Sequence, residues 1–424
     1  MARKQASGSA VDPSDVTVVV LGGGRGSRLY PLTKYRAKPA VGFGGKYRLV
    51  DIVLTNCLGS KLSRIFILTQ FNSYSLNRHI WQTYSRFALG EEGIIDVIAA
   101  EQTPDSRDWF QGTADAVRQS FRHVLARNPR HVLVLSADQI YAMDYRELLA
   151  WHLGHGAHVT IAALCTPEAE VHRLGVVQVD ERMRVVGFAE KPETLDEVAG
   201  FRVESHPEIQ AAAGKPFLCS MGIYLFNTDV LAEALDNDFE DFGRQVIPAT
   251  AERRTMSCFP FDGYWEDVGT IEAFYAANMD WREAGGIAQM FERGASIITH
   301  ARQLPPSRIE GTLVDHSLIA DGCHIHAERI ARSIVGVRSR IGDSTVIEDS
   351  IVMGSDFSEG PVPFDIGSNC HIRRAIIDKN AIIGDGTIIA APAGSADTDC
   401  ELYSIRSGIV VIPRSAVLPP GTRI

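Results

Sequence analysis

The chain has 424 residues, of which 45% are hydrophobic and 22% charged, and its formal net charge is -10. These values are ordinary for a soluble protein of two or three domains, and the acidic balance argues against a general nucleic-acid binder. Seven cysteines without a Cys-x-x-Cys pair argue against a disulfide framework and a zinc site. No apolar run approaches the roughly 20 residues of a membrane helix, and the polar start lacks the core of a signal peptide. We therefore expect a cytoplasmic protein with a disordered segment at residues 1–15.

The first predicted element is a buried strand at residues 16–20 (VTVVV), and the segment LGGGRGSRLYPLTKYRAKPA follows it directly. Glycine has no Cβ, so backbone N–H groups are open to phosphate oxygens, and the basic side chains suit a triphosphate. The segment fits neither a P-loop nor the dinucleotide fingerprint, so we interpret it as an anion loop of another kind. A tight turn with a solvated basic face is the alternative. The residues concerned are Gly22, Gly23, Gly24, Arg25, Arg28 and Lys38.

Short apolar strands then alternate with helical stretches as far as about residue 235. The alternation predicts an α/β doubly wound sheet, in which ligands gather at the carboxyl ends of parallel strands. We expect Thr113 to be the N-cap of one of the helices, with Asp115 in its first turn. The predicted parallel strands are residues 64–70, 131–139 and 158–165, and the predicted helices are residues 48–60 and 113–128.

Two carboxylates are candidate metal ligands. Asp138 ends a buried strand, where a charged group is costly without a partner, although a helix N-cap there would be unremarkable. Asp267 lies in GYWEDVGT, after a short aromatic run, and its alternative role is that of a turn residue. Two carboxylates and phosphate oxygens are ligands that Mg²⁺ prefers. We therefore predict that Asp138 and Asp267 hold Mg²⁺.

Two later segments are candidates for contact with a second, smaller phosphate and a sugar. In Glu190-Lys191-Pro192, proline fixes the backbone beside a lysine that can act as a point-charge clamp. The segment SMGIYLFN places Ser220 and Tyr224 before a predicted strand. These two residues are either partners for sugar hydroxyls or simply the entry to the strand.

After about residue 295 the pattern becomes a six-residue repeat of aliphatic residues followed by small or turn residues. This repeat, with its Ile-Gly-Asp steps, predicts a parallel β-helix rather than the alternative β-sandwich. We expect residues 354–365 to bulge from it, and the exposed edges of the coil favour a homo-oligomer. The aliphatic residues are Leu313, Ile319, Ile325, Val335, Ile341, Ile347, Ile366, Ile372, Ile377, Ile383 and Ile389. The predicted domains are residues 16–280 and 310–424, joined by a linker at residues 281–309.

Several segments, taken in order, closely resemble glucose-1-phosphate adenylyltransferase (ADP-glucose pyrophosphorylase): LGGGRGSRLYPLTKYRAKPAV, DWFQGTADAVRQ, AEKP, SMGIYLF, YWEDVGT and RSGIVVI. The resemblance covers almost the whole chain. It implies a Rossmann-like nucleotidyltransferase domain, a C-terminal left-handed β-helix and usually a homotetramer. It also implies transfer of the adenylyl group of ATP to α-D-glucose 1-phosphate, giving ADP-glucose and pyrophosphate, the committed and regulated step of glycogen or starch synthesis.

The resemblance further assigns roles to individual residues. Asp138 resembles the catalytic, metal-holding aspartate, with Asp267 as its metal partner. In the mechanism that this implies, Arg25, Arg28 and Lys38 stabilise the departing pyrophosphate. The nucleotide side comprises Gly22, Gly23, Gly24, Arg25, Gln102 and Gly112. The glucose 1-phosphate side comprises Phe110, Gly175, Glu190, Lys191, Ser220, Tyr224, Asp241 and Trp265. Phe110 stands where many bacterial members have tyrosine, so it offers no hydroxyl group.

The family is allosterically controlled by glycolytic or photosynthetic intermediates, with phosphate or AMP as common inhibitors. Lys46 in FGGKYR resembles the activator-binding lysine of enteric-type members. Lys379 and Arg414 resemble activator positions of the plant and cyanobacterial type, with Arg414 in place of a lysine. Features of both patterns leave the activator open.

Three alternatives remain at this level. One is another sugar-1-phosphate nucleotidyltransferase that uses dTTP or UTP. A second is a non-catalytic regulatory subunit, which would lack the charged residues of the site, whereas Arg28, Lys38, Asp138 and Lys191 are all present. A third is an acyltransferase that works from the β-helix. Its candidate imidazoles are His316, His324, His326 and His371.

Overall fold

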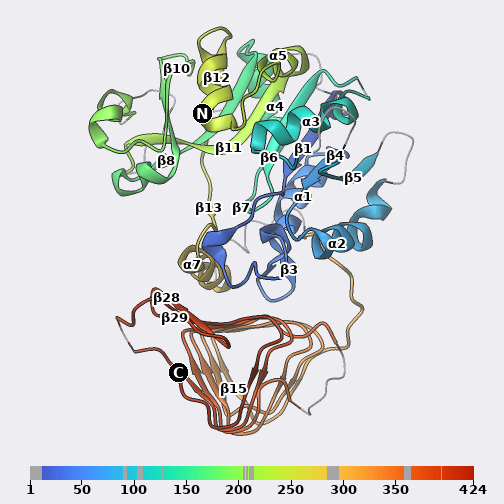
Figure 1. Cartoon of the computed structure of the whole chain (residues 1–424), viewed down its shortest axis with the longest axis vertical. Coiled ribbons are helices and arrows are strands. Elements are labelled where there is room, and N and C mark those ends of the chain that lie inside the picture. The colour runs from blue at the N-terminus through green and yellow to red at the C-terminus, as the bar shows by residue number, and fades with distance from the viewer. Residues whose placement is uncertain are drawn as a thin grey trace, which may run out of the picture.

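A computed structural model of the chain describes residues 12–424 apart from 89–92, 103–107, 127, 204–205, 207–208, 210–213, 284–295, 358–363 and 393. Figure 1 shows an α/β domain above a three-sided coil of short strands. The disorder predicted for residues 1–15 falls mostly outside the described residues. Pro13–Asp15, which that prediction included, form a short 3-10 helix (η1) because Asp12 caps the amide of Ser14.

Among the described residues, nine strands form the central sheet, in the order β10-β9-β11-β6-β1-β4-β5, with β8 and β12 continuing from β11. Strands β1, β4, β5 and β6 are parallel neighbours, which confirms the predicted parallel core. The strands are β1 (Val16–Leu21), β4 (Arg64–Thr69), β5 (Ile94–Ala99), β6 (His131–Ser136), β8 (Val159–Thr166), β9 (Gly175–Val179), β10 (Val185–Glu190), β11 (Phe217–Asn227) and β12 (Met256–Phe261).

The strand predicted at residues 158–165 has different neighbours from those expected. β8 pairs in parallel with β12, but its other neighbour, β11, is antiparallel both to it and to β6. The long strand β11 is thus inserted between two strands that run in the same direction. Its apolar sequence fits a buried strand of either direction, so the pattern alone did not reveal the pairing.

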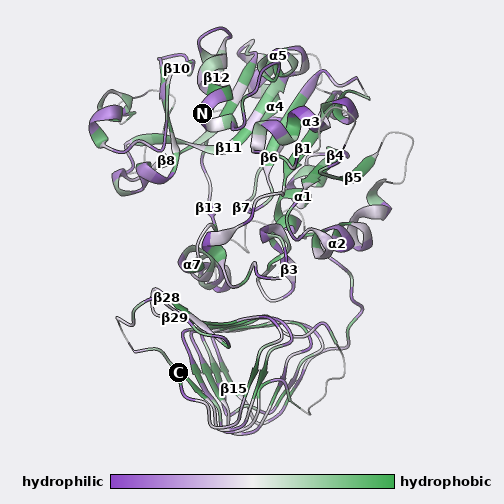
Figure 2. Cartoon of the chain, in the orientation of Figure 1, coloured by the Kyte–Doolittle hydropathy of each residue, from purple (hydrophilic) through white to green (hydrophobic). Residues whose placement is uncertain are grey.

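Helices cover both faces of the sheet, and Figure 2 shows its strands as the most hydrophobic part of this domain. Alternate residues of β1 enter two different cores, Val19 on one face and Val18 and Val20 on the other, each 0% exposed. This two-sided burial is typical of a doubly wound sheet. The helices are α1 (Leu49–Gly59), α2 (Tyr74–Tyr84), α3 (Thr113–Leu125), α4 (Tyr145–Gly154), α5 (Thr228–Ala234), α6 (Ile247–Ala251) and α7 (Ile271–Arg282).

The predicted helices at 48–60 and 113–128 correspond to α1 and α3. The N-cap prediction was wrong by one residue, since Gly112 is the cap and Thr113 is the first helical residue. The Thr113 hydroxyl instead accepts the amide of Phe242 at 3.1 Å. Short elements complete this half of the chain: η2 (Ser27–Leu29), η3 (Lys38–Ala40), β2 (Gly42–Phe43), β3 (Tyr47–Arg48), η4 (Ser85–Ala88), β7 (Gln139–Tyr141), η5 (Glu168–Arg173), η6 (Leu195–Phe201), the π-helical turn η7 (Phe242–Val246) and β13 (Trp265–Asp267).

The second half forms the predicted parallel β-helix. Equivalent strands stack in register, as in the row of Ile309, Ile325 and Ile341. One side holds β14 (Arg308–Ile309), β17 (His324–Ile325) and β20 (Arg340–Ile341). The second holds β15 (Leu313–Asp315), β18 (Arg329–Ala331), β21 (Val346–Glu348), β23 (His371–Arg373) and β26 (Ile388–Ile389). The third holds β16 (Leu318–Ile319), β19 (Ile334–Val335), β22 (Ile351–Val352), β24 (Ala375–Ile377) and β29 (Ile409–Ile412).

The last coils depart from this regular stack. β25 (Ile382–Ile383) pairs in parallel with β30 (Val417–Leu418), and β27 (Thr398–Asp399) and β28 (Ser404–Arg406) form antiparallel pairs at the edge. Most of the predicted aliphatic residues point inward, and Ile325, Ile341 and Ile347 are fully buried. Leu313 is an exception: it is 61% exposed, because in the first coil its neighbour Val314 holds the stacking position opposite Ile330. The tip of the bulge expected at 354–365 lies outside the described residues.

The two halves share a third apolar core. It joins residues of the glycine-loop region and α7, such as Leu32 and Phe274, to β-helix residues such as Ile376 and Val411. A buried ion pair, Arg36 with Asp378, crosses the same boundary. Within the described part of the chain, no helix combines the length and apolar composition needed to cross a bilayer.

Candidate active site

The glycine loop leaves β1 at the carboxyl end of the sheet. The Gly22 amide donates to Leu68 O of β4 at 2.9 Å, so the loop starts tied to the neighbouring strand. Gly26 has φ +60°, and a Cβ there would lie 3.2 Å from Lys38 Cβ, so this turn needs glycine. Among the described residues, no acceptor is found for the amides of Gly23, Gly24 and Arg25. These free donors can therefore bind an anion.

Asp138 and Asp267 meet at one cation, the Lys38 ammonium. Its Nζ lies 2.8 Å from Asp138 Oδ2 and 3.2 Å from Asp267 Oδ1. Burial would raise the pKa of Asp138, but Lys38 and a hydrogen bond from Ser136 hold it below its usual value. Burial would likewise lower the pKa of Lys38, but the two carboxylates raise it. Asp138 is thus ionised, and both carboxylates lie within reach of one cation.

Strand topology explains why residues so far apart in sequence converge. Asp138 follows β6 and precedes β7, and β7 pairs antiparallel with β13, so that Gln139 lies opposite Asp267. Arg28 reaches the same place, because a Cβ built on Gly269 would lie 3.3 Å from Arg28 Nη2 and 3.2 Å from Asp267 Oδ2. The predicted acidic pair and one predicted arginine therefore lie together beside the loop.

A cavity of about 340 Å³ opens beside the glycine loop. Its far wall is the start of α3. The backbone of Glu240 packs so closely on Gly112 there that a Cβ on Gly112 would lie 2.2 Å from Glu240 O, so only glycine fits. Gln70 fixes the adjoining backbone, since it accepts the amide of Phe110 at 2.6 Å and donates to the carbonyl of Phe110 at 3.2 Å. The predicted residues that line this cavity are Gly22, Gly23, Gly24, Arg25, Phe110, Gly112 and Asp138.

Glu190, at the end of β10, occupies space that two glycines leave open. A Cβ on either Gly175 or Gly243 would lie 2.7 Å from Glu190 Oε2. The Lys191 ammonium lies 3.3 Å from Glu190 Oε1 and is half exposed, and Lys191 has φ +51°. The predicted clamp residues therefore lie side by side, with the lysine free to reach outward.

Ser220 and Tyr224 lie inside β11, not before it, so the interpretation as strand entry was wrong. Ser220 Oγ lies 3.4 Å from the Tyr224 hydroxyl, and both residues are buried. Asp241 caps η7 through the amide of Arg244 and lies 3.5 Å from the Thr113 hydroxyl, beside Gly112.

Gln102 is exposed, three residues beyond the end of β5, and it does not line the cavity. It shares the carboxyl edge of the sheet with the loop, but the next residues along the chain are not described. Sequence reasoning missed several polar groups of the site, among them Gln70, Ser136 and Gln139. Gln70 directly follows β4, Ser136 ends β6 and Gln139 begins β7, and these positions are their only sequence signal.

The predicted effector residues lie at the junction of the two halves. Lys379 Nζ and Arg414 Nη2 both bind Asp356, at 2.9 and 2.7 Å. Burial lowers the pKa of Lys379 to about 8, with Arg302 and Arg48 nearby adding repulsion. Lys46 faces another carboxylate, Asp321 of the β-helix, at 3.7 Å. Lys46 and Arg302 both line a junction cavity of about 530 Å³.

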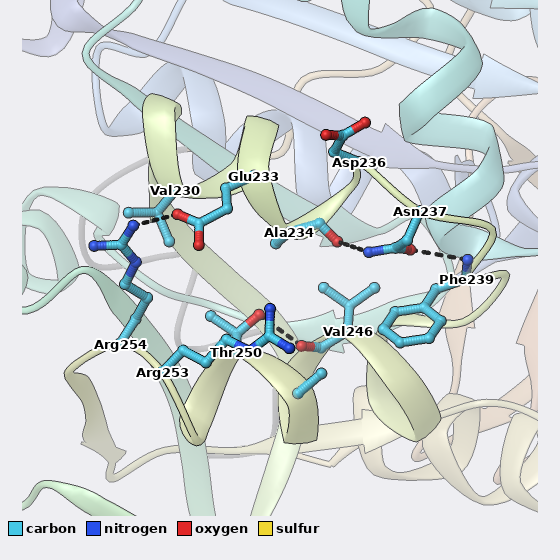
Figure 3. Close-up of a pocket in the computed structure, with 11 residues that line it drawn as sticks. Val230, Glu233, Ala234, Asp236, Asn237, Phe239, Val246, Thr250, Arg253 and Arg254 are labelled. Atoms are coloured by element: carbon cyan, nitrogen blue, oxygen red, sulfur yellow. Dashed lines mark hydrogen bonds and ion pairs between the residues drawn. The ribbon is translucent and has the colours of Figure 1, made fainter.

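A separate hollow of about 220 Å³ lies between α5 and α6 (Figure 3). Its floor is apolar, with Val230 and Val246 buried, and Glu233 pairs with Arg254 at its rim. It contains none of the predicted site residues, and its described polar groups are largely paired with one another. We therefore place the candidate active site at the glycine loop.

In the described part of the chain, no group of three or more His, Cys, Asp and Glu side chains is placed to hold a metal ion. Two carboxylates do converge, however, and the position between them already holds a cation, the ammonium of Lys38. Hard oxygen donors of this kind, completed by phosphate oxygens and waters, suit Mg²⁺. The residues present therefore fit a divalent cation that binds together with a phosphate substrate.

Comparison with known proteins agrees with this geometry. Residues 17–284 match the family described as Nucleotidyl transferase, so the fold and site define a nucleotidyl transferase. Residues 302–423 match the GLGC left-handed parallel beta-helix domain. The chain is 42% identical to the wheat (Triticum aestivum) glucose-1-phosphate adenylyltransferase small subunit, chloroplastic/amyloplastic, over 443 aligned positions that cover 98% of this chain and 92% of the wheat protein. The chain belongs to the glucose-1-phosphate adenylyltransferase family.

Proposed function

We propose that this enzyme transfers the adenylyl group of ATP to α-D-glucose 1-phosphate, giving ADP-glucose and pyrophosphate, as the name of the wheat relative indicates. The observation that carries the proposal is the convergence of two carboxylates on Lys38, beside a loop whose amides have no acceptor among the described residues. Such a site would bind phosphate oxygens at the amides and a divalent cation at the carboxylates. The reaction supplies the activated glucose for a glycogen- or starch-type glucan.

The protein's part in the reaction is to bring two anions together. The amides of Gly23 and Gly24 and the guanidinium groups of Arg25 and Arg28 bind the triphosphate, and Lys191 binds the sugar phosphate. A phosphate oxygen of glucose 1-phosphate then attacks the α-phosphorus of ATP in line, and pyrophosphate leaves. No covalent intermediate with the protein is needed.

Asp138 and Asp267 would hold Mg²⁺ when substrates bind. A divalent cation there would neutralise charge on the phosphates. Lys38 contacts both carboxylates in the structure, and it would turn toward the leaving pyrophosphate once a divalent cation takes its place between them. Glu190, held by Gly175 and Gly243, would accept sugar hydroxyl groups.

The Asp138→Asn variant tests the catalytic proposal. Loss of one carboxylate charge from the pair is expected to lower turnover by about 10³-fold or more, with the fold intact, because charge stabilisation is the main catalytic term. The assay supplies ATP and glucose 1-phosphate and detects pyrophosphate, with circular dichroism as the folding control. Near-normal pyrophosphorolysis of ADP-glucose by the variant would contradict the role of Asp138.

The same assay with dTTP and UTP addresses the alternative nucleotides. We expect ATP to be preferred, with Gln102 near the base. A non-catalytic regulatory subunit is the other alternative, and measurable turnover by the purified wild-type chain alone would exclude it. The retained charges at Arg28, Lys38, Asp138 and Lys191 support catalysis.

We further propose that the junction binds phosphate-bearing effectors. Lys379 and Arg414 share Asp356, and Arg48 and Arg302 add charge to the same region, so an anion could replace the carboxylate as their partner. Activation by a glycolytic-type phosphate and inhibition by phosphate or AMP would act here, in a homotetramer. Lys379→Ala is expected to abolish the response to effectors while basal activity remains, measured as ADP-glucose formation with and without each effector.

A further inference from the structure

The side chain of Gln139 connects three strands beside the proposed acidic pair. It is 7% exposed. Its Nε2 donates to Met221 O of β11 at 2.8 Å, and its Oε1 accepts the indole N–H of Trp265, on β13, at 3.3 Å. Its backbone lies opposite Asp267 in the β7–β13 pair. One amide thus joins the segments that carry Asp138, Ser220 and Trp265.

The contact on β11 lies at an irregularity of that strand. The register of β11 against β8 shifts between Ser220 and Ile223, and Gly222 has φ +69°. The Gly222 amide donates to Ser220 Oγ at 3.1 Å, so the irregularity also orients the Ser220 hydroxyl. A β-bulge re-aims side chains in this way next to functional sites. By binding Met221 O, Gln139 fixes the bulge relative to Asp138.

The two hydrogen bonds require a donor and an acceptor on one short side chain. A carboxamide has both, an ionised carboxylate has only acceptors, and leucine has neither. A buried carbonyl left without its donor is destabilising, which would favour a rearranged bulge. The chemistry of residue 139 therefore decides whether the sugar-side groups keep their places.

We propose that Gln139 is a positioning residue for the sugar phosphate. Its side chain holds the Trp265 indole and the Ser220–Gly222 bulge in place next to Asp138, the preceding residue in the chain. The inference rests on the proposed function. It assigns Gln139 to the sugar side rather than the nucleotide side, because neither of its side-chain partners belongs to the glycine loop. Loss of this side chain weakens glucose 1-phosphate binding and misaligns the bound sugar phosphate, and it leaves ATP binding nearly unchanged.

The test compares Gln139→Leu and Gln139→Glu with Gln139→His, in which a neutral imidazole can donate from one nitrogen and accept at the other. We expect the first two variants to raise KM for glucose 1-phosphate by about tenfold or more, with KM for ATP changed less than about threefold. Gln139→His should recover most of the loss. Asn56→Leu is the matched control: Asn56 is a buried amide that donates to Tyr141 O, at the other end of β7.

Asn56→Leu is expected to lower the melting temperature without changing KM for glucose 1-phosphate. If Gln139→Leu behaves like this control, or raises both KM values equally, Gln139 is only structural and the inference is overturned. The wild type separates the two proposals. If it is active only with another sugar phosphate or triphosphate, the proposed function fails and the KM comparison is made with that pair. If it is inactive with every pair, both proposals fail.

Discussion

Among single residues, Gly243 limits the site closely, because its missing side chain makes room for Glu190. A Cβ there would lie 2.7 Å from Glu190 Oε2 and 3.0 Å from its Cδ. Gly243→Ala is therefore expected to displace the carboxylate and to raise KM for glucose 1-phosphate by about tenfold, equivalent to about 1.4 kcal/mol. Steady-state kinetics with each substrate varied in turn measures this effect.

Gly154→Ala is the control for that variant. Gly154 ends α4, and a Cβ there would meet nothing within 4 Å. Both changes add one methyl group to a helical backbone, so the difference between them reports the contact with Glu190. An unchanged KM for glucose 1-phosphate in Gly243→Ala would show that Glu190 does not contact the sugar phosphate.

Lys38 sets the pH range over which the acidic pair stabilises the fold. Burial would raise the pKa of Asp138, but Lys38 holds it below 3.8, and the carboxylates hold the pKa of Lys38 above 10.5 against the effect of burial. A carboxyl group whose pKa is lowered in the folded state stabilises the fold at pH values above its pKa in the unfolded chain. This stabilisation is lost as the pH falls through the folded-state pKa. A lysine whose pKa is raised in the folded state stabilises the fold at pH values below its pKa in the unfolded chain. This stabilisation is lost as the pH rises through the folded-state pKa.

The variant Lys38→Met should therefore be less stable than the wild type between about pH 5 and pH 10, and the difference should shrink below about pH 4. Thermal melting at each pH in buffer with a chelator measures this, because the chelator removes metal ions that could replace the ammonium. A difference that stays constant down to about pH 2 would contradict the role of Lys38 as the counter-ion of Asp138.

Among the elements, one buried carboxylate connects α1 to α2 and to the segment that leads into the β-helix. Asp51 of α1 is 0% exposed. It accepts hydrogen bonds from the Tyr84 hydroxyl at 2.8 Å and from Thr299 at 2.7 Å, and it lies 2.6 Å from the ring of His79. Burial would raise the pKa of Asp51, but His79, Thr299 and the Arg48 amide hold it below its usual value. The carboxylate therefore stays charged and keeps segment 296–302 against the α/β domain.

Asp51→Asn is expected to lower the free energy of unfolding by about 2–4 kcal/mol, because a buried charge network loses its acceptor. Protection of the Ile298 amide, which donates to Thr55 at 2.9 Å, should fall further than that of the central strands. Urea unfolding and hydrogen exchange measure the two effects. Equal loss of protection in β1 and at Ile298 would mean that Asp51 stabilises the whole domain without fastening the segment.

The elements also show how much the sequence could predict. The glycine loop and the six-residue repeat depend on short-range signals, glycine spacing and aliphatic period, and both lie where the sequence placed them. The insertion of β11 between β6 and β8 could not be predicted from short-range signals, because an apolar strand pairs equally well in either direction. Gln139 was missed for a similar reason: its partners, Met221 and Trp265, lie 82 and 126 residues away.

In the whole molecule, the two halves are joined by a core and by a charge pair that the sequence could not reveal. Arg36 Nη2 lies 2.5 Å from Asp378 Oδ1, 342 residues along the chain, and both side chains are almost fully buried. Arg36 comes two residues before Lys38, and Asp378 comes immediately before Lys379. The pair therefore links the proposed effector cluster to the lysine of the acidic pair by short stretches of backbone.

A double-mutant cycle on this pair tests whether the halves fold as one unit. Arg36→Met or Asp378→Leu alone leaves a buried charge unpaired and is expected to cost about 3–5 kcal/mol, whereas the double variant, with two apolar side chains, should recover much of that loss. Calorimetry should give one transition for the wild type, because the third core spans both halves, and two for each single variant. Additive losses in the double variant, with a single transition throughout, would show that the apolar core alone holds the halves together.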